Sequence, residues 1–239
     1  MKMLESGVAV PMYLQLKTTL LSQIRSGRYR RDKRLPSEPE LCRRYGVSRI
    51  TVRRAIQELV DEGYVVKRQG KGTFVCGHTI DRKIAYVSGF TESAEQAGFA
   101  VSSTLLKREV IQVPGRITRL LGLPDGAPVL YTQRKRMADG RPVMLENNYF
   151  PLPKFDFLRR SDLSGSLYRL LGSERGIDPI HPRETSICMA LADEKMANTM
   201  DVVVGTPFFK VDTFICDQHD EPVHVGHQFF LGELYTFKI

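Results

Sequence analysis

The amino-acid sequence predicts an α+β protein with two domains. The first third shows helical periodicity followed by a hairpin pattern, whereas the rest alternates irregularly between strand-like and helix-like stretches. The 239 residues are enough for each domain to bury its own core. Residues 1–80 carry 16 Lys and Arg against 7 Asp and Glu, while residues 81–239 carry 19 against 20. This division predicts a polyanionic partner for the basic module, although charge alone is equally compatible with an inert solvated surface.

The composition predicts a cytoplasmic location and no contact with membranes. No run of 18 apolar residues marks a membrane span, and the first residues, MKMLESGVAVP, lack the apolar stretch of a secretory signal. The four cysteines are scattered and form no CxxC pair, so we expect reduced thiols. They are Cys42, Cys76, Cys188 and Cys216.

Three helices are predicted in the basic module. The first begins near Pro11 and ends at Gly27, and its apolar residues recur at helical spacing. The second covers residues 38–45, opens with a capping box of Ser37 and Glu40, and ends at Gly46. The third begins after Ser48 and buries one apolar stripe: Val52, Ala55, Ile56, Leu59 and Val60. Two helices joined by a short turn with glycine form a helix-turn-helix pattern.

A β-hairpin follows Gly63. Residues 64–66 and 73–75 can form two strands, joined by a tight turn at residues 69–72. On the third helix, Arg49 and Arg53 lie four residues apart on one exposed face, where they can reach DNA bases or phosphates. These features together predict a winged helix-turn-helix that binds DNA, the alternative being arginines that are merely solvated.

The segment LPSEPELCRRYGVSRITVRRAIQELVDEGYVVKRQGKGTFV resembles the DNA-binding motif of the GntR family, and the match spans about residues 10–76. The resemblance implies DNA contacts from the start of the third helix and from the tip of the wing. Carried over, these contacts fall on Ser48, Arg49, Thr51, Arg53, Gly70 and Lys71. The family usually has arginine directly after LPSE, where this sequence has Pro39, so the affinity for DNA or the base preference is expected to differ. Lys33, Arg43 and Arg44 are candidates for compensation.

The second part of the chain contains an internal repeat. After a polar linker at residues 77–83, segments 126–150 and 205–230 share a Gly-x-Pro start, a strand, a polar turn and a strand that ends in aromatic residues. A helical stretch precedes each segment. We therefore predict two equivalent hairpins that pair into one antiparallel sheet with flanking helices.

This second part resembles the effector domain of the HutC subfamily of GntR regulators, the UTRA domain, which has a chorismate-lyase-like fold. The resemblance covers residues 84–239 and rests on SGFTE, RKR, GRPVMLENNYFP, LSGSLYRLL, EPVH and LGELYTF. The predicted domains are accordingly a DNA-binding domain at 1–76, a linker at 77–83 and an effector and dimerisation domain at 84–239.

A small-molecule pocket is predicted in this domain. Arg134 and Arg136 are two apart on a strand, so both face one side and suit a phosphate or carboxylate, the alternative being surface charge. Ser166 opens a helix, which also favours an anion, and Glu146 could hold sugar hydroxyls or an amine, or could pair with the arginines. The resemblance implies that the pocket is lined by Phe90, Thr91, Arg134, Arg136, Glu146, Ser166, Tyr168 and His224. Many relatives have an acidic residue where this sequence has His224, which leaves the ligand open.

Three rival interpretations remain. His219, His224, His227 and Cys216 could bind a metal, but residues 224 and 227 would face opposite sides of a strand. A lyase-like enzyme would need a nucleophile motif, a phosphate loop or paired catalytic carboxylates, none of which the sequence shows. A DNA-binding structural protein would have no effector. We expect no catalytic residue, no cofactor and no metal.

The sequence therefore predicts a ligand-responsive regulator, most simply a repressor released by a small anionic metabolite. A phosphorylated sugar is favoured, and an amino-acid-derived carboxylic acid is the alternative. A homodimer is expected, because one winged module buries little surface on an operator of double-stranded DNA. The ligand would reorder the pocket, and the linker would change the spacing of the two DNA-binding modules.

Overall fold

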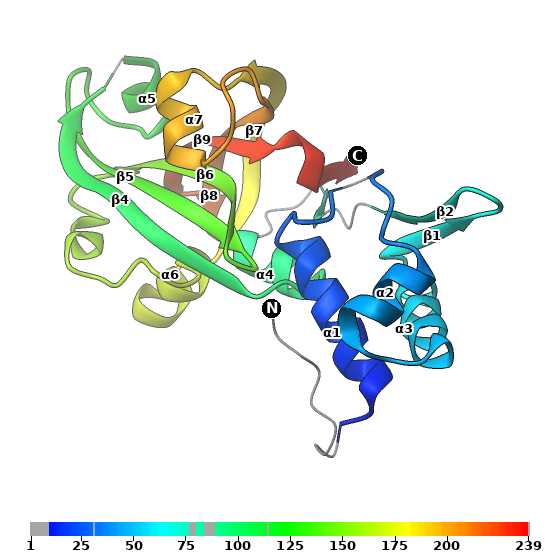
Figure 1. Cartoon of the computed structure of the whole chain (residues 1–239). Helices are drawn as coiled ribbons and strands as arrows, with labels where there is room; N and C mark the ends of the chain where they lie inside the picture. The colour runs from blue at the N-terminus through cyan, green and yellow to red at the C-terminus, as the bar shows by residue number, and fades with distance from the viewer. Residues whose placement is uncertain (1–9, 31, 77–79, 84–88, 114, 239) are drawn as a thin grey trace. The chain divides into compact units, whose positions relative to one another are not determined.

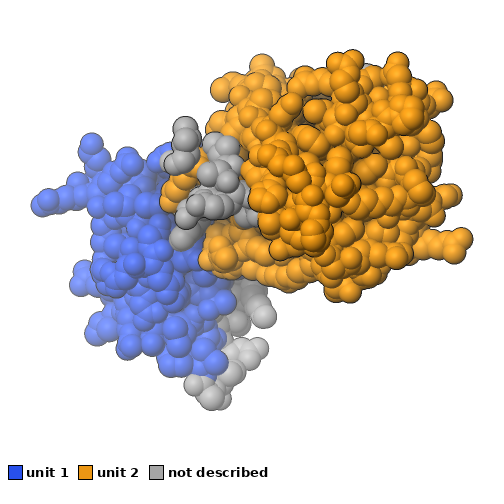
Figure 2. Space-filling model, turned by 180° about the vertical axis from the view of Figure 1, so that it is seen from behind, with its two compact units in different colours: residues 1–78 blue, residues 79–239 orange. Residues whose placement is uncertain are grey.

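We describe a computed structural model of the chain that covers residues 10–30, 32–76, 80–83, 89–113 and 115–238. The chain divides into two compact units, Met1–His78 and Thr79–Ile239, which are coloured separately in Figure 2. Each unit is described by itself. In the described part of the chain, no helix is both long and apolar enough to cross a membrane.

The first unit contains three helices and one hairpin (Figure 1). They are α1 (Met12–Arg25), α2 (Glu38–Tyr45), α3 (Arg49–Asp61), β1 (Val65–Arg68) and β2 (Gly72–Val75). Pro11 occupies the cap position before α1 rather than its first turn, and the hairpin strands pair antiparallel from Val65↔Val75 to Arg68↔Gly72. The predicted helices and wing are confirmed. Strand β1 begins one residue later and ends two residues later than predicted, and β2 begins one residue earlier.

Local signals set the ends of these helices. The backbone N–H of Ser37 donates to Glu40 Oε2 at 2.7 Å, which is one arm of the predicted capping box. Gly46 ends α2 with φ of 66°, a left-handed conformation that glycine adopts at little cost. The apolar faces of all three helices meet in one core, which includes Leu16, Leu20, Leu41, Val52, Ile56 and Leu59. Truncating one of these leucines to alanine typically costs about 2–5 kcal/mol.

The second unit is built on a six-stranded antiparallel sheet in the order β4-β5-β6-β9-β8-β7. The strands are β4 (Val101–Gln112), β5 (Pro128–Ala138), β6 (Arg141–Pro151), β7 (Pro179–Leu191), β8 (Pro207–Asp217) and β9 (Pro222–Leu231). The hairpins β5–β6 and β8–β9 join through their second strands, from Met144↔Phe230 to Tyr149↔Val225. The two predicted hairpins therefore do form a single sheet.

Helices cover both faces of this sheet (Figure 1). The helical elements of the unit are α4 (Phe90–Gln96), α5 (Gly115–Leu120), η1 (Asp156–Arg159), α6 (Leu167–Arg175), α7 (Glu194–Met200) and η2 (Gly232–Leu234). On one face, α4 packs near Met144 and Phe230, and α6 packs near Phe150 and Ile215. On the other face, α5 packs near Val129 and Val225, and α7 packs near Leu145 and Phe208. This partition follows the two-residue period of the strands, because alternate side chains point to opposite faces.

A second, small sheet joins distant parts of the unit. Strand β3 (Ile80–Lys83) pairs in parallel with β10 (Tyr235–Lys238), near the C-terminal end of the chain. The linker predicted at 77–83 thus contains a paired strand in its second half, while residues 77–79 lie outside the described residues. Parallel pairing with a segment 155 residues further along the chain (Ile80 with Tyr235) leaves no short-range signal in the sequence, which explains why this strand was not predicted.

Candidate functional site

The start of α3 is ordered by its own side chains. Ser48 precedes the helix as its cap and accepts a hydrogen bond from the backbone N–H of Thr51 at 3.2 Å. Its hydroxyl also lies 2.9 Å from the Thr51 hydroxyl. The cap satisfies a backbone donor that a free helix start would leave unpaired, and it keeps both hydroxyls at the exposed end of the helix.

Exposed cations surround this helix start. Arg49 and Arg53 are both exposed, and Arg53 Nε donates to Glu38 Oε2 on α2 at 2.9 Å. Arg54 lies on the opposite flank, where its guanidinium stacks over the Tyr13 ring at 3.7 Å. Because pairs between exposed side chains contribute little stability in water, Arg53 can leave Glu38 for a stronger anion at small cost.

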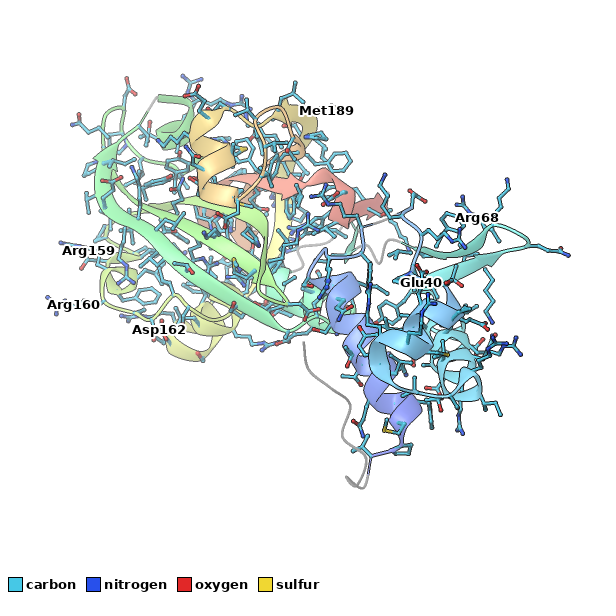
Figure 3. All side chains as sticks on the ribbon, in the orientation of Figure 1. Glu40, Arg68, Arg159, Arg160, Asp162 and Met189 are labelled. Carbon is cyan, nitrogen blue, oxygen red and sulfur yellow. The ribbon has the colours of Figure 1, made fainter. Side chains whose placement is uncertain are left out.

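The hairpin carries a second group of cations. Gly70 has φ of 70° and sits in the turn before Lys71, whose side chain is exposed. Figure 3 labels Arg68 on this hairpin. Its guanidinium lies 4.7 Å from the centre of the Phe74 ring and 3.9 Å from Asp32. The first unit therefore presents a capped helix end and a basic hairpin, the two elements that winged helix-turn-helix proteins direct toward DNA.

In the second unit, a small pocket lies on the face of the sheet covered by α4 and α6. Seven of the eight predicted effector residues line it: Phe90, Thr91, Arg134, Arg136, Glu146, Ser166 and Tyr168. The pocket encloses about 20 Å³ of free space, room for about one water molecule. The structure thus brings these residues together around one small pocket.

Two buried arginines and one buried carboxylate form the floor of this pocket. Arg134 Nη2 lies 2.7 Å from Glu146 Oε2, and Arg136 Nη1 lies 3.8 Å from the same oxygen. Both arginines are only 2% exposed. Arg134 and Glu146 are direct cross-strand partners on β5 and β6, so the register of the hairpin creates the pair. Glu146 therefore pairs with the two arginines, as one of the two predicted alternatives for this residue states.

The arginines also hold the elements that cover the pocket. Arg134 Nη1 donates to the carbonyls of Leu163 and Gly165, each at 3.1 Å, and Arg136 Nη1 donates to the Gly165 carbonyl at 3.1 Å. Arg136 Nη2 donates to the Thr91 hydroxyl on α4 at 2.6 Å. The guanidinium groups therefore link the sheet to α4 and to the loop that precedes α6.

That loop is folded by Asp162, which is labelled in Figure 3. Its carboxylate accepts from the Ser164 backbone N–H at 2.9 Å and from the Ser164 hydroxyl at 2.8 Å, and both bonds lower the pKa of Asp162. Ser166 then caps α6 and donates to Glu92 Oε1 of α4 at 2.9 Å. The two helices above the pocket are thus joined to each other as well as to its floor.

The charge state of the floor follows from its surroundings. Burial alone would raise the pKa of Glu146, but Arg134 and Arg136 outweigh it and lower the pKa to about 2. Burial lowers the pKa of Arg136 to about 10, a shift that Glu146 opposes. Near pH 7 the three groups therefore carry two positive charges and one negative charge, and this buried excess of one positive charge favours an anion.

His224 lies at the edge of this cluster, on β9, but does not line the pocket. It is fully buried, with Nε2 3.1 Å from the Tyr168 hydroxyl and its ring 5.6 Å from the Phe150 ring. Burial lowers its pKa from an ordinary 6.5 to about 4, so it is neutral near pH 7. Its contact with the pocket passes through Tyr168.

The opposite face of the sheet carries a wider hollow of about 580 Å³, between α5 and strands β7 to β9. Two pairs of side chains in this hollow are in contact: His227 Nδ1 lies 2.6 Å from Asp212, and Arg116 lies 3.5 Å from Glu184. His227 and His224 thus face opposite sides of β9. Among the described residues, no three His, Cys, Asp or Glu side chains gather in a metal-binding arrangement.

Each of the two units contains a region that matches a known family or domain model. The model of the GntR family of bacterial regulatory proteins matches residues 12–75, and the model of the UTRA domain matches residues 96–236. The chain belongs to the GntR family. Its members of this type are transcription regulators and not enzymes, so the lyase-like interpretation is set aside.

Relatives of known sequence span the whole of this GntR protein. An uncharacterised helix-turn-helix regulator of Bacillus subtilis, YurK, is 31% identical over 99% of this chain and 98% of its own length. A probable repressor of the fructoselysine utilization operon of Escherichia coli O157:H7 is 30% identical over 95% of this chain and 93% of its own. The crystal structure of PhnF from Mycobacterium smegmatis superposes with a TM-score of 0.70 at 28% identity, over 95% of this chain and 97% of that one.

Sequence reasoning missed several residues of the pocket in this GntR protein. Met144 and Gln228 share a sheet face with Glu146 and His224, so the two-residue period of β6 and β9 could have found them. Arg82 could not be found in this way. It reaches the pocket from β3, and its guanidinium lies 4.9 Å from the centre of the Phe230 ring.

Proposed function

We propose that this protein is a HutC-type repressor whose binding to operator DNA is released by a small anionic metabolite, with a phosphorylated sugar as the favoured class. The observation that carries the proposal is the pair of buried guanidinium groups of Arg134 and Arg136 that share the single carboxylate of Glu146. Transcription regulation is common to its relatives. The protein would act in the cytoplasm as a homodimer, without a cofactor or a metal.

The polar groups around the pocket suit a phosphate ester. Two guanidinium groups, the Thr91 hydroxyl and the capped start of α6 at Ser166 offer donors to a phosphate. Glu146 offers acceptors to sugar hydroxyls. An amino-acid-derived acid would use the same cations but would leave more of these donors unpaired. One relative's link to an operon for fructoselysine utilization also favours a sugar-derived ligand.

Binding has to rearrange the cover of the pocket, because about 20 Å³ cannot hold a sugar phosphate. The arginines now donate to carbonyls of the loop before α6 and to Thr91 of α4. A phosphate that takes over these donors would free both elements to move. Arg82 would carry the change further, since β3 directly follows the segment that connects the two units.

For DNA recognition we propose the residues expected from the family resemblance: Ser48, Arg49, Thr51, Arg53, Gly70 and Lys71. The exposure of Arg49, Arg53 and Lys71 supports this role, as does the Ser48 cap that orders the helix start. Salt-dependent phosphate contacts would provide much of the affinity. A dimer would present two such modules to two half-sites.

Apolar side chains on the surface of the second unit support the homodimer. Met189 and Leu191 at the end of edge strand β7 are 71% and 65% exposed, and Val203 and Val204 are 77% and 63% exposed (Figure 3 labels Met189). Backbone bonds of Ala192 with Gly205 and Thr206 bring these two segments together. Such a patch gains from burial against a second copy of the chain.

The test is a thermal-shift screen in which each phosphorylated sugar is compared with its unphosphorylated parent and with amino-acid-derived acids. We expect a phosphorylated sugar to raise the Tm of the wild type and to weaken its binding to operator DNA. Ser166→Ala and Arg136→Lys should lose most of the response, and Arg119→Gln, an exposed change on α5, should keep it. A compound that binds but leaves DNA affinity unchanged would contradict the proposal.

A further inference from the structure

One exposed side chain at the start of α3 differs in kind from its neighbours. Ile50 is 80% exposed, whereas the apolar stripe of the same helix is buried in the core, at Val52, Ala55, Ile56 and Leu59. The side chain thus contributes almost nothing to packing within the unit. Single exposed aliphatic side chains are common on proteins, so the position of Ile50 decides what it means.

Ile50 is the second residue of α3 and follows directly on the capped start of the helix. Its neighbours present polar groups: the exposed guanidinium of Arg49 on one side and the Thr51 hydroxyl, paired with Ser48, on the other. Arg53 is three residues further on, on the same exposed side. In a helix-turn-helix, the first residues of the second helix are those that reach the base edges.

The chemistry of the major groove selects one contact for an aliphatic group at this place. The base edges there present hydrogen-bond donors and acceptors, and the only apolar group among them is the 5-methyl group of thymine. Covering a donor or acceptor with an isoleucine would strip it of water without a new partner, which is unfavourable. Covering a methyl group removes apolar surface from water on both sides, which is favourable.

We propose that Ile50 recognises the 5-methyl group of a thymine in each operator half-site and so helps to set the base preference of the protein. Arg49 and Arg53 then supply contacts to phosphates or guanines, while Ile50 supplies the apolar part of the readout. The proposal rests on the proposed binding of DNA by this face, and it concerns which base is read rather than whether DNA is bound.

The experiment begins with selection of bound duplexes from a random library by the full-length protein. Each thymine of the selected site is then replaced singly by deoxyuridine, which removes only the methyl group. Wild type should lose about fourfold in affinity at one thymine per half-site, and Ile50→Ala should lose nothing at that position. Ile50→Met, which keeps an apolar side chain, should retain part of the sensitivity, and Val10→Ala, another exposed aliphatic position in the same unit, all of it.

The outcomes distinguish the role assigned to Ile50 from the proposed binding of DNA. If Ile50→Ala remains as sensitive to the missing methyl group as the wild type, or if no thymine shows sensitivity in the wild type, the assignment of Ile50 is wrong. If the wild type selects no duplex at all, the proposed DNA-binding function fails instead. An unchanged Tm of Ile50→Ala is expected from the exposure of the side chain, and it confirms that affinity and not folding has changed.

Discussion

The two units each contain a pair of arginines suited to an anion, but the pairs lie in opposite environments. Arg49 and Arg53 of the first unit are exposed to water, and Arg53 has one carboxylate partner at the surface. Arg134 and Arg136 of the second unit are buried. Together they contact one carboxylate, donate three hydrogen bonds to backbone carbonyls and donate one to a hydroxyl. Under the proposed function, the exposed pair serves DNA without serving the fold, whereas the buried pair serves both the fold and the ligand.

This difference sets how each pair responds to change. Exposed cations are screened by salt and contribute little to stability, so their removal should mainly lower the affinity for DNA. Buried cations have already lost their hydration, so their removal leaves partners that nothing else can satisfy.

The largest effect is expected for Arg134→Met. The change leaves the buried Glu146 carboxylate with the more distant Arg136 as its cation and with the Asn148 amide, and it leaves the carbonyls of Leu163 and Gly165 with one donor fewer. The free energy of unfolding of the second unit should fall by about 3–5 kcal/mol. Urea unfolding followed by circular dichroism measures it.

Two control variants sharpen this comparison. Adding Glu146→Gln to Arg134→Met removes the stranded charge and should restore part of the loss. Arg49→Met should leave the unfolding midpoint unchanged and should instead weaken DNA binding and lower the slope of affinity against salt. Equal destabilisation by Arg49→Met and Arg134→Met would remove the distinction between the two pairs.

The helices and the wing of the first unit were predictable because their signals are local. Caps such as Ser48, glycines such as Gly46 and a regular apolar stripe act within a few residues. The same stripe excludes Ile50 from the core, so its exposure was predictable, whereas its uncharged side chain gave no electrostatic signal of a role at the DNA surface. At the start of a recognition helix, an exposed apolar side chain is as informative as an exposed charge.

The sheet and the residues of the pocket were predictable from period and resemblance, but the state of the pocket was not. Alternation predicted that Arg134 and Arg136 share one face, and Glu146 on the return strand was a possible partner for them; the structure shows both features. Nothing in the sequence indicated that the carbonyls of Leu163 and Gly165 accept from the arginine donors, because that contact joins a strand to an irregular loop about 30 residues further along the chain. Tertiary contacts of this kind also explain the missed role of Arg82 on β3.

A pH effect of intermediate size is expected from His224. Because its folded pKa is about 4 and its ordinary value is 6.5, the unfolded chain takes up a proton below about pH 6.5 while the native state does not. Native stability should therefore fall as the pH drops, by about 2 kcal/mol between pH 7.5 and pH 5. Glu146 adds little in this window, since its folded pKa is about 2 and an ordinary Glu titrates near 4.3.

His224→Gln tests this prediction, because glutamine keeps a polar group near Tyr168 but does not titrate. Unfolding by urea at pH 7.5 and at pH 5 should show a clearly smaller loss of stability in the variant than in the wild type. His224 belongs to the second unit, so the effect separates the buried cluster from the DNA-binding surface. The same loss in both proteins would assign the pH dependence to other groups.

The smallest effect is expected for Arg82→Gln, which tests how the two regions communicate. Arg82 lines the pocket but lies on β3, and among the described residues no carboxylate lies within ion-pair distance of it. The variant should bind DNA like the wild type in the absence of ligand, because none of the proposed DNA contacts has changed.

Once a ligand is identified, saturation with it should change the DNA affinity of the variant several-fold less than that of the wild type. The coupling free energy between two such sites is typically about 1–3 kcal/mol. Fluorescence anisotropy of labelled operator with and without ligand measures both quantities. Weaker ligand binding with undiminished release at saturation would make Arg82 a contact of the ligand alone, and the connection between the buried and the exposed arginines would then have to run through α4 or α6.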